Sequence, residues 1–310
     1  MKQNIVLIKL HYPLFIVLFV LSGCIHKRQI DKQKLLIITK KPLSYTPKII
    51  QNPPVTIWVH GTLMFRKPVY YHIFGDKPSL IPVMNLHNNH HFYTLAQAIS
   101  ENDPEQFPLH EFYIFNWSGK LQHQERKKAA KKLFEEIITL RKTYKERYGH
   151  VPVIQIITHS HGGNLVLNMA SIKNIYTQFH IELLILLACP VQEKTMHYIN
   201  NPLFKRIYSL YSGLDMIQIL APQIRRKNPH IKYKLPYRIP PFSSRLFPQY
   251  DHLIQAKIKV NNHSISHTHF SKQEFAALLP SIIEKLDSWN NGVKTTGNNC
   301  RYKLLCVYKK

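Results

Sequence analysis

The feature that most constrains the fold is a series of short apolar runs separated by helical segments. Each run is largely apolar at consecutive positions rather than at every second position, and the runs occupy residues 55–59, 111–117, 151–158, 182–188, 206–211 and 254–260. Strands of this kind are buried on both faces, as in parallel sheets that are covered by helices. Strands that alternate with helices are joined by right-handed crossovers. The predicted fold class is therefore α/β, with a doubly wound, mostly parallel sheet and helices on both faces.

The longest helical segment is predicted over residues 122–148, with others over 162–175 and 271–289. In the longest, apolar residues recur every three or four positions, as expected for one buried face: Ala129, Leu133, Ile137, Leu140 and Tyr144. Gly149 follows this segment as a stop signal. Two stretches, 65–91 and 217–253, lack a regular pattern, and long irregular segments in compact domains are often functional.

Residues 1–23 have the features of an export signal. Lysines precede an apolar run over 14–21, which is too short to cross a bilayer as a helix of about 20 residues. The run ends in Leu21-Ser22-Gly23-Cys24, which resembles the lipobox of bacterial lipoproteins. The resemblance implies cleavage before Cys24, lipidation of that residue and an exported protein anchored to a membrane. Ile25 replaces the Asp that often retains lipoproteins at the inner membrane, so an outer-membrane destination is compatible with the sequence. A plain signal peptide with a chance cysteine is the alternative.

Composition divides the rest of the chain. Residues 24–52 are basic and contain prolines, which predicts a tether; residues 53–290 carry the pattern of a folded domain; residues 291–310 form a polar tail that is expected to be disordered. The chain has 42 Lys and Arg against 17 Asp and Glu, a formal net charge of +25. This balance favours anionic partners such as a membrane surface, although an ordinary basic surface gives the same count. The sequence has no zinc-finger, homeodomain or RNA-recognition signature, which argues against nucleic acid as a partner.

Residues 158–163, with the sequence THSHGG, follow a predicted strand and begin a predicted helix. This is the setting of a nucleophile elbow, a sharp turn that exposes a serine hydroxyl above the sheet. Gly162 supplies the space that the turn needs, whereas Thr158 stands where such elbows usually have glycine. Ser160 is therefore the candidate nucleophile, and a serine that caps a helix is the structural alternative.

A second motif, His60-Gly61-Thr62, follows the first strand of the predicted sheet. Gly61 allows the backbone to approach a substrate closely. We expect the backbone N–H of Thr62, or that of Leu63, to form an oxyanion hole with the N–H of His161. A turn that simply ends the strand is the alternative for this motif.

Four motifs together resemble the α/β-hydrolase superfamily, especially its lipase- and esterase-like members. They are HGT at 60–62, FNWSG at 115–119, THSHGG at 158–163 and LLACPV at 186–191. The resemblance covers residues 54–289, so residues 53–290 are expected to form an α/β-hydrolase domain. It implies a catalytic triad in the chain order serine, acid, histidine, which needs no cofactor.

The acid of this triad should follow a strand after the elbow. We predict Asp215, with Glu193 and Asp251 as the competing acids. The base should lie between the last strand and the last helix, where the sequence offers three histidines: His263, His267 and His269. We predict His267, because it lies near the start of the helix and still in the loop, and the sequence leaves the other two open. A metal site at these histidines is not expected, because acidic or cysteine partners are lacking beside them.

The predicted chemistry is ester hydrolysis through an acyl-enzyme, in which the base takes the serine proton and the acid orients the base. The expected anchor, the basic charge and the aromatic stretch after residue 64 favour a lipid or other hydrophobic acyl ester as the substrate. The residues expected to contact its acyl part are Leu63, Tyr70, Tyr71 and Phe74. Packing of these side chains against the core is the structural alternative.

Two other functions remain open. A surface lipoprotein could use a hydrolase scaffold to bind a ligand without cleaving it, because a fold does not fix a function. An acyltransferase would use the same triad and pass the acyl group to an acceptor other than water. The sequence does not separate hydrolysis from transfer, whereas analysis of the products does.

Overall fold

The structure is a computed structural model, and it describes residues 36–38, 53–62, 77–173, 178–221, 243–292 and 302–307. All of these residues belong to one compact unit, Lys34–Lys310. The export signal with Cys24 lies outside the described residues, and so do the expected acyl-contact residues Leu63, Tyr70, Tyr71 and Phe74. Within the described ranges, no helix is long and apolar enough to cross a membrane.

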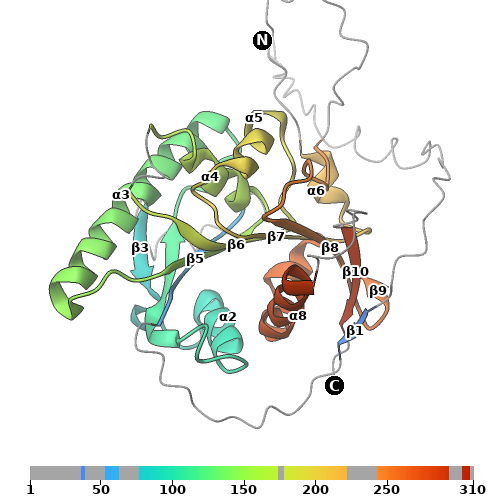
Figure 1. Ribbon diagram of the computed structural model, residues 1–310, viewed down its shortest axis with the longest axis horizontal. Helices are drawn as coiled ribbons and strands as arrows, with labels where there is room; N and C mark the ends of the chain where they lie inside the picture. The colour runs from blue at the N-terminus through green and yellow to red at the C-terminus, as the bar shows by residue number, and fades with distance from the viewer. Residues whose placement is uncertain are drawn as a thin grey trace, which may run out of the picture. The chain divides into compact units, whose positions relative to one another are not determined.

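The centre of the unit is one sheet of ten strands (Figure 1), in the order β1-β10-β8-β7-β6-β5-β2-β4-β3, with β9 paired to β8. The strands are β1 Leu36–Ile38, β2 Val55–Val59, β3 Ser79–Pro82, β4 Phe112–Asn116, β5 Ile154–His159, β6 Ile181–Leu187, β7 Ile207–Tyr211, β8 Leu253–Val260, β9 His263–Ser264 and β10 Tyr302–Val307. Every neighbouring pair is parallel except β3 with β4 and β8 with β9. The predicted α/β class with a mostly parallel sheet is confirmed.

Helices cover both faces of the sheet, with α2 and α8 on one side and α3 and α4 on the other (Figure 1). The helices are α2 His91–Ser100, α3 His123–Tyr148, α4 His161–Met169, α5 Glu193–Met196, α6 Met216–Leu220, α7 Gln273–Ala276 and α8 Leu279–Gly292. Ile99 of α2 and Ile282 of α8 belong to one buried apolar cluster. Leu133 of α3 and Val166 of α4 belong to a second cluster, on the opposite face. Burial of both faces explains why the central strands are apolar at consecutive positions.

The helix predicted over 122–148 is confirmed as α3. Its inward positions are buried, including Ala129, Leu133 and Ile137. Gly149 ends the helix with φ 77°, and its N–H donates to Lys145 O at 3.0 Å. A positive φ of this kind at a helix end favours glycine, which explains the stop signal in the sequence. By contrast, α4 ends at Met169, several residues before the predicted end.

Four strands of the described residues occur where the sequence predicts none. β3 lies in the irregular stretch after residue 64, β1 lies in the predicted tether, the two-residue β9 lies in the loop of the three histidines, and β10 lies in the tail that is expected to be disordered. In β10, Leu305, Cys306 and Val307 are fully buried or nearly so, and all six residues pair with β8. Such a short apolar run among lysines has no periodicity of its own, so only its pairing with β8 defines it as a strand.

Candidate active site

Ser160 lies at the turn between β5 and α4, with φ 54° and ψ −130°. A positive φ is unusual for a residue with a side chain and costs about 1–3 kcal/mol, so neighbouring contacts must hold the turn. The Ser160 N–H donates to Leu187 O at 2.8 Å, and the Gly163 N–H donates to Ser160 O at 3.0 Å. The turn is therefore the strained strand-to-helix connection that a nucleophile elbow requires.

Two glycines make room for this turn. A β-carbon on Gly162 would lie 2.4 Å from Val59 O and 2.7 Å from His60 O, which are backbone atoms. A β-carbon on Gly61 would lie 2.8 Å from Ser160 Cβ. The end of β2 and the elbow thus approach so closely that a side chain at either glycine would push them apart.

Thr158 occupies the elbow position at which glycine is usual. The residue is completely buried at the end of β5, and its hydroxyl donates to Ile185 O of the neighbouring strand β6 at 3.1 Å. Because the hydroxyl is hydrogen-bonded and the side chain packs between strands, the turn accommodates a threonine here without an unsatisfied polar group.

Asp215 and His267 form a buried pair, although they are far apart in the chain. Asp215 follows β7 and caps α6, and its Oδ1 accepts the Gln218 N–H at 2.9 Å. Its other oxygen, Oδ2, accepts a hydrogen bond from His267 Nδ1 at 2.8 Å. Arg245 Nη2 donates to the Asp215 carbonyl oxygen at 2.9 Å and so holds the loop that carries the acid. Both residues are almost completely buried, with relative exposures of 1% for Asp215 and 7% for His267.

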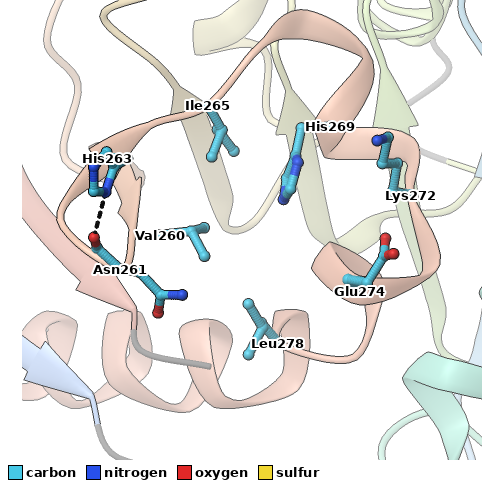
Figure 2. A pocket seen from close by; sticks show the side chains of 8 residues that line it. All are labelled: Val260, Asn261, His263, Ile265, His269, Lys272, Glu274 and Leu278. Atoms are coloured by element: carbon cyan, nitrogen blue, oxygen red, sulfur yellow. Dashed lines mark hydrogen bonds between the residues drawn. The ribbon is translucent and has the colours of Figure 1, made fainter. Parts of the chain in front are cut away.

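The other two histidines of the same loop point elsewhere. His263 is exposed, and its Nδ1 donates to Asn261 O at 2.7 Å. His263 and His269 border a pocket of about 350 Å³ to which Lys272 and Glu274 also contribute (Figure 2). None of the atoms of Ser160, Asp215 or His267 lines this pocket. In the part of the chain that is described, no group of three His, Cys, Asp or Glu side chains is arranged to hold a metal ion.

The competing acids are placed differently from Asp215. Glu193 begins α5, after β6, and Asp251 comes just before β8. Strands β5 to β8 run parallel. Asp251 therefore lies at the amino-terminal ends of these strands, whereas the residues that follow β5 and β7 lie at the carboxyl-terminal ends. Of the three acids, the structure pairs Asp215 with a histidine of the predicted loop.

His159 holds His267 beside the turn of Ser160, a role that the sequence did not predict. His159 immediately precedes Ser160, and its Nε2 donates to His267 O at 3.0 Å. The two imidazole rings lie 4.8 Å apart between centroids, at an angle of 48°. His159 therefore positions the backbone of His267 next to the serine turn. The sequence feature that could have indicated this positioning role is the pair of histidines, His159 and His161, that flank Ser160.

His161, on the other side of Ser160, is a buried and neutral imidazole. Burial lowers the pKa of His161 to about 3, and the nearby Arg126 and His267 contribute to this lowering. Its Nδ1 atom is buried without a hydrogen-bond partner among the described residues. Arg126 is itself buried, which lowers the pKa of its guanidinium to about 10, so it remains charged at neutral pH. The candidate site is therefore bordered by a fixed positive charge.

The predicted oxyanion donors lie at the same edge of the sheet as Ser160. β2 and β5 pair in parallel with Val59 opposite Thr158, so the residues after each strand are neighbours. The turn after β2 is anchored by Trp117 Nε1, which donates to His60 O at 2.9 Å. His161 is the first residue of α4, where a backbone N–H has no partner within its own helix and the helix dipole favours negative charge.

No family model and no curated protein sequence matches this chain. Among solved structures, the chain is similar to the phospholipase PlaB from Legionella pneumophila, in complex with thio-NAD, with 19% identity and a TM-score of 0.29. The match covers 44% of this chain and 25% of the phospholipase chain. So distant a similarity carries no argument about activity.

Proposed function

We propose that this protein is a membrane-anchored serine hydrolase that cleaves an ester bond through an acyl-enzyme. Ser160 is the nucleophile, His267 is the general base and Asp215 orients the base. The observation that carries the proposal is the buried Asp215–His267 pair, which is held by His159 beside the positive-φ turn of Ser160. A serine on an elbow, an aspartate and a histidine, in this chain order, are the parts that acyl transfer to serine requires.

The reaction proceeds in two halves. His267 Nε2 takes the Ser160 proton as Oγ forms a bond to the acyl carbon, and Asp215 stabilises the imidazolium that results. The N–H groups of Thr62 and His161 hold the negative oxygen of the tetrahedral intermediate. The ester C–O bond then breaks, and the imidazolium gives its proton to the departing alcohol. Water then attacks the acyl carbon as His267 takes its proton, the acyl–Oγ bond breaks, and the imidazolium returns the proton to Ser160 Oγ, which releases the carboxylic acid.

The proposed substrate is a lipid or another hydrophobic acyl ester near a membrane. Support comes from the net charge of +25, which favours an anionic surface, and from the lipobox-like segment that ends in Cys24. Lipidation of Cys24 would hold the exported protein at the membrane, where such esters are concentrated. The proposed reaction needs no cofactor.

The test is covalent labelling with a fluorophosphonate probe, which reacts with activated serines. We expect the purified protein to be labelled and Ser160→Ala to be unlabelled. The matched control is Ser288→Ala, an exposed serine on α8 that donates to Lys285 O and lies outside the candidate site. His267→Ala should also lose labelling, whereas His263→Ala, a change in the same loop, should retain it.

Each other outcome contradicts a stated part of the proposal. A folded wild-type protein that is not labelled would favour a non-catalytic lipoprotein on the same scaffold. Labelling that survives in Ser160→Ala would place the nucleophile elsewhere. Release of an acylated acceptor in place of free fatty acid would make the enzyme an acyltransferase, so the products of a model ester are analysed in the same experiment.

A further inference from the structure

The helix that follows the proposed catalytic acid exposes its apolar side chains. Four large apolar residues next to Asp215 are strongly exposed: Leu214 (66%), Met216 (54%), Ile217 (49%) and Leu220 (50%). We call these four residues the apolar patch. Three of them lie on α6, where Leu220 follows Met216 by four residues and Ile217 by three, so the three share one side of the helix.

The orientation of α6 is the reverse of that expected for a helix in contact with water. Its buried residue is Gln218, whose Nε2 donates to Cys189 O at 2.7 Å and whose N–H donates to Asp215 Oδ1. The polar residue therefore faces the protein, whereas three of the four apolar residues of α6 face outward and the fourth, Ile219, is half-buried. An apolar cluster of this kind on the surface of a soluble domain marks a site of interaction with a membrane or another molecule.

The charges beside the patch are positive. Arg245 donates to Gly213 O at 3.1 Å and to Asp215 O. The Lys257 side chain packs over Gly213, where an added β-carbon would lie 3.2 Å from Lys257 Cε. The segment from residue 206 to residue 221 contains one acidic residue, Asp215, and its side chain is buried and paired with His267. Exposed apolar side chains bordered by cations match the chemistry of an anionic lipid surface, which offers both hydrocarbon and negative charge.

We propose that the apolar patch docks this protein on an anionic lipid surface. The patch is continuous in the chain with the loop of Asp215, so docking through α6 brings the proposed active site to the membrane surface. This inference rests on the proposed function only for its biological purpose, because binding to lipid does not require Ser160. It also assigns to α6 a contact with the membrane that is separate from the proposed lipid anchor at Cys24.

The test is flotation of the full-length chain with vesicles of phosphatidylcholine alone or mixed with an equal amount of phosphatidylglycerol. All proteins carry Cys24→Ala, so that a lipid anchor does not contribute. Ile217→Ser/Leu220→Ser alters the patch, and Val151→Ser/Val153→Ser is the matched control, since it removes two exposed apolar residues before β5. We expect the patch variant to bind the mixed vesicles about tenfold more weakly than its parent, and the control to bind like the parent.

The anionic component is tested with the same proteins. Binding of the parent should weaken when phosphatidylglycerol is omitted and when salt is raised, because both reduce the attraction between the cations and the surface. Unchanged binding by the patch variant would overturn the proposal, and so would equal binding of the parent to both kinds of vesicle. Concentration-dependent dimers that the patch variant alone fails to form, with vesicle binding unaltered, would make the patch a self-association surface instead.

Fluorophosphonate labelling of the same proteins separates this proposal from the proposed function. A patch variant that folds and labels like its parent but no longer floats supports docking through α6. If the parent floats, the patch variant does not, and neither protein is labelled, the docking surface is supported and the hydrolase function is contradicted. Adding Ser160→Ala to the parent should leave flotation unchanged, and loss of flotation in that protein would contradict docking that is independent of the nucleophile.

Discussion

Replacement of Asp215 by Asn tests the proposed triad in detail, because it removes a charge and keeps the shape of the side chain. Asp215 Oδ1 accepts the Gln218 N–H at 2.9 Å, and Oδ2 accepts from His267 Nδ1 at 2.8 Å. The single amide oxygen of the Asn must stay opposite the Gln218 N–H, because the reverse orientation sets two donors against each other. The amide NH2 group then faces His267 Nδ1, which has to become an acceptor.

The consequence is that the imidazole proton moves to Nε2, the atom that is proposed to take the proton of Ser160. We expect kcat/KM for a soluble ester such as p-nitrophenyl butyrate to fall on the order of 10⁴-fold. That loss corresponds to about 5 kcal/mol of transition-state stabilisation. Thermal unfolding should change little, because the variant keeps both hydrogen-bonded neighbours.

The control is Asp251→Asn, which changes an exposed acid just before β8 and should leave kcat/KM as it is in the wild type. Both variants are compared at the same pH, with circular dichroism as the check on folding. A folded Asp215→Asn enzyme that keeps activity within about tenfold of the wild type would refute the role of Asp215 in orienting the base.

Three further predictions concern the neighbouring histidines and the amino terminus. His159→Phe removes the donor to His267 O, so steady-state kinetics should show about a tenfold lower kcat at unchanged KM. His159→Gln should restore part of this loss, and equal activity of both variants with the wild type would contradict a positioning role. The pKa of His161 is about 3 in the fold against 6.5 in the unfolded chain, so the unfolded state binds the proton first as pH falls. The free energy of unfolding should therefore decrease below pH 6.5 by up to about 1.4 kcal/mol per pH unit from this group, and urea unfolding of His161→Gln should show a weaker pH dependence. Cys24→Ala should abolish incorporation of labelled fatty acid in a bacterial host, and persistent labelling would exclude Cys24 as the lipidated residue.

The fold class and the sharp strand-to-helix turn at Ser160 could be predicted because their signals are local. Strands buried on both faces are apolar at consecutive positions, and this pattern needs no knowledge of the neighbouring strands. The turn at Ser160 requires small residues within a few positions, so Gly162 and the strand-to-helix context indicate it directly. Thr158 shows the limit of the local rule, because its accommodation depends on a hydrogen bond to Ile185 in a different strand.

The choice among the histidines depended on the tertiary structure. His263, His267 and His269 lie in one loop at spacings that leave any of them able to turn toward the acid. Only the tertiary structure pairs His267 with Asp215, which follows β7, and places the other two histidines at a separate pocket. The contact of His159 with His267 likewise joins residues more than a hundred positions apart.

The sequence alone also did not determine which side chains are buried. The segment Met216–Leu220 is a short apolar stretch, and nothing in its composition says that Gln218 is buried while Met216, Ile217 and Leu220 are exposed. The strand Tyr302–Val307 is likewise not evident from the sequence, because only its pairing with β8 defines it as a strand. Sequence therefore determined the apolar central strands, the long helix α3 and the sharp turn at Ser160, because periodicity and turn chemistry act over a few residues. The tertiary structure decided which side chains meet and which face the solvent, because those contacts join segments that are distant in the chain.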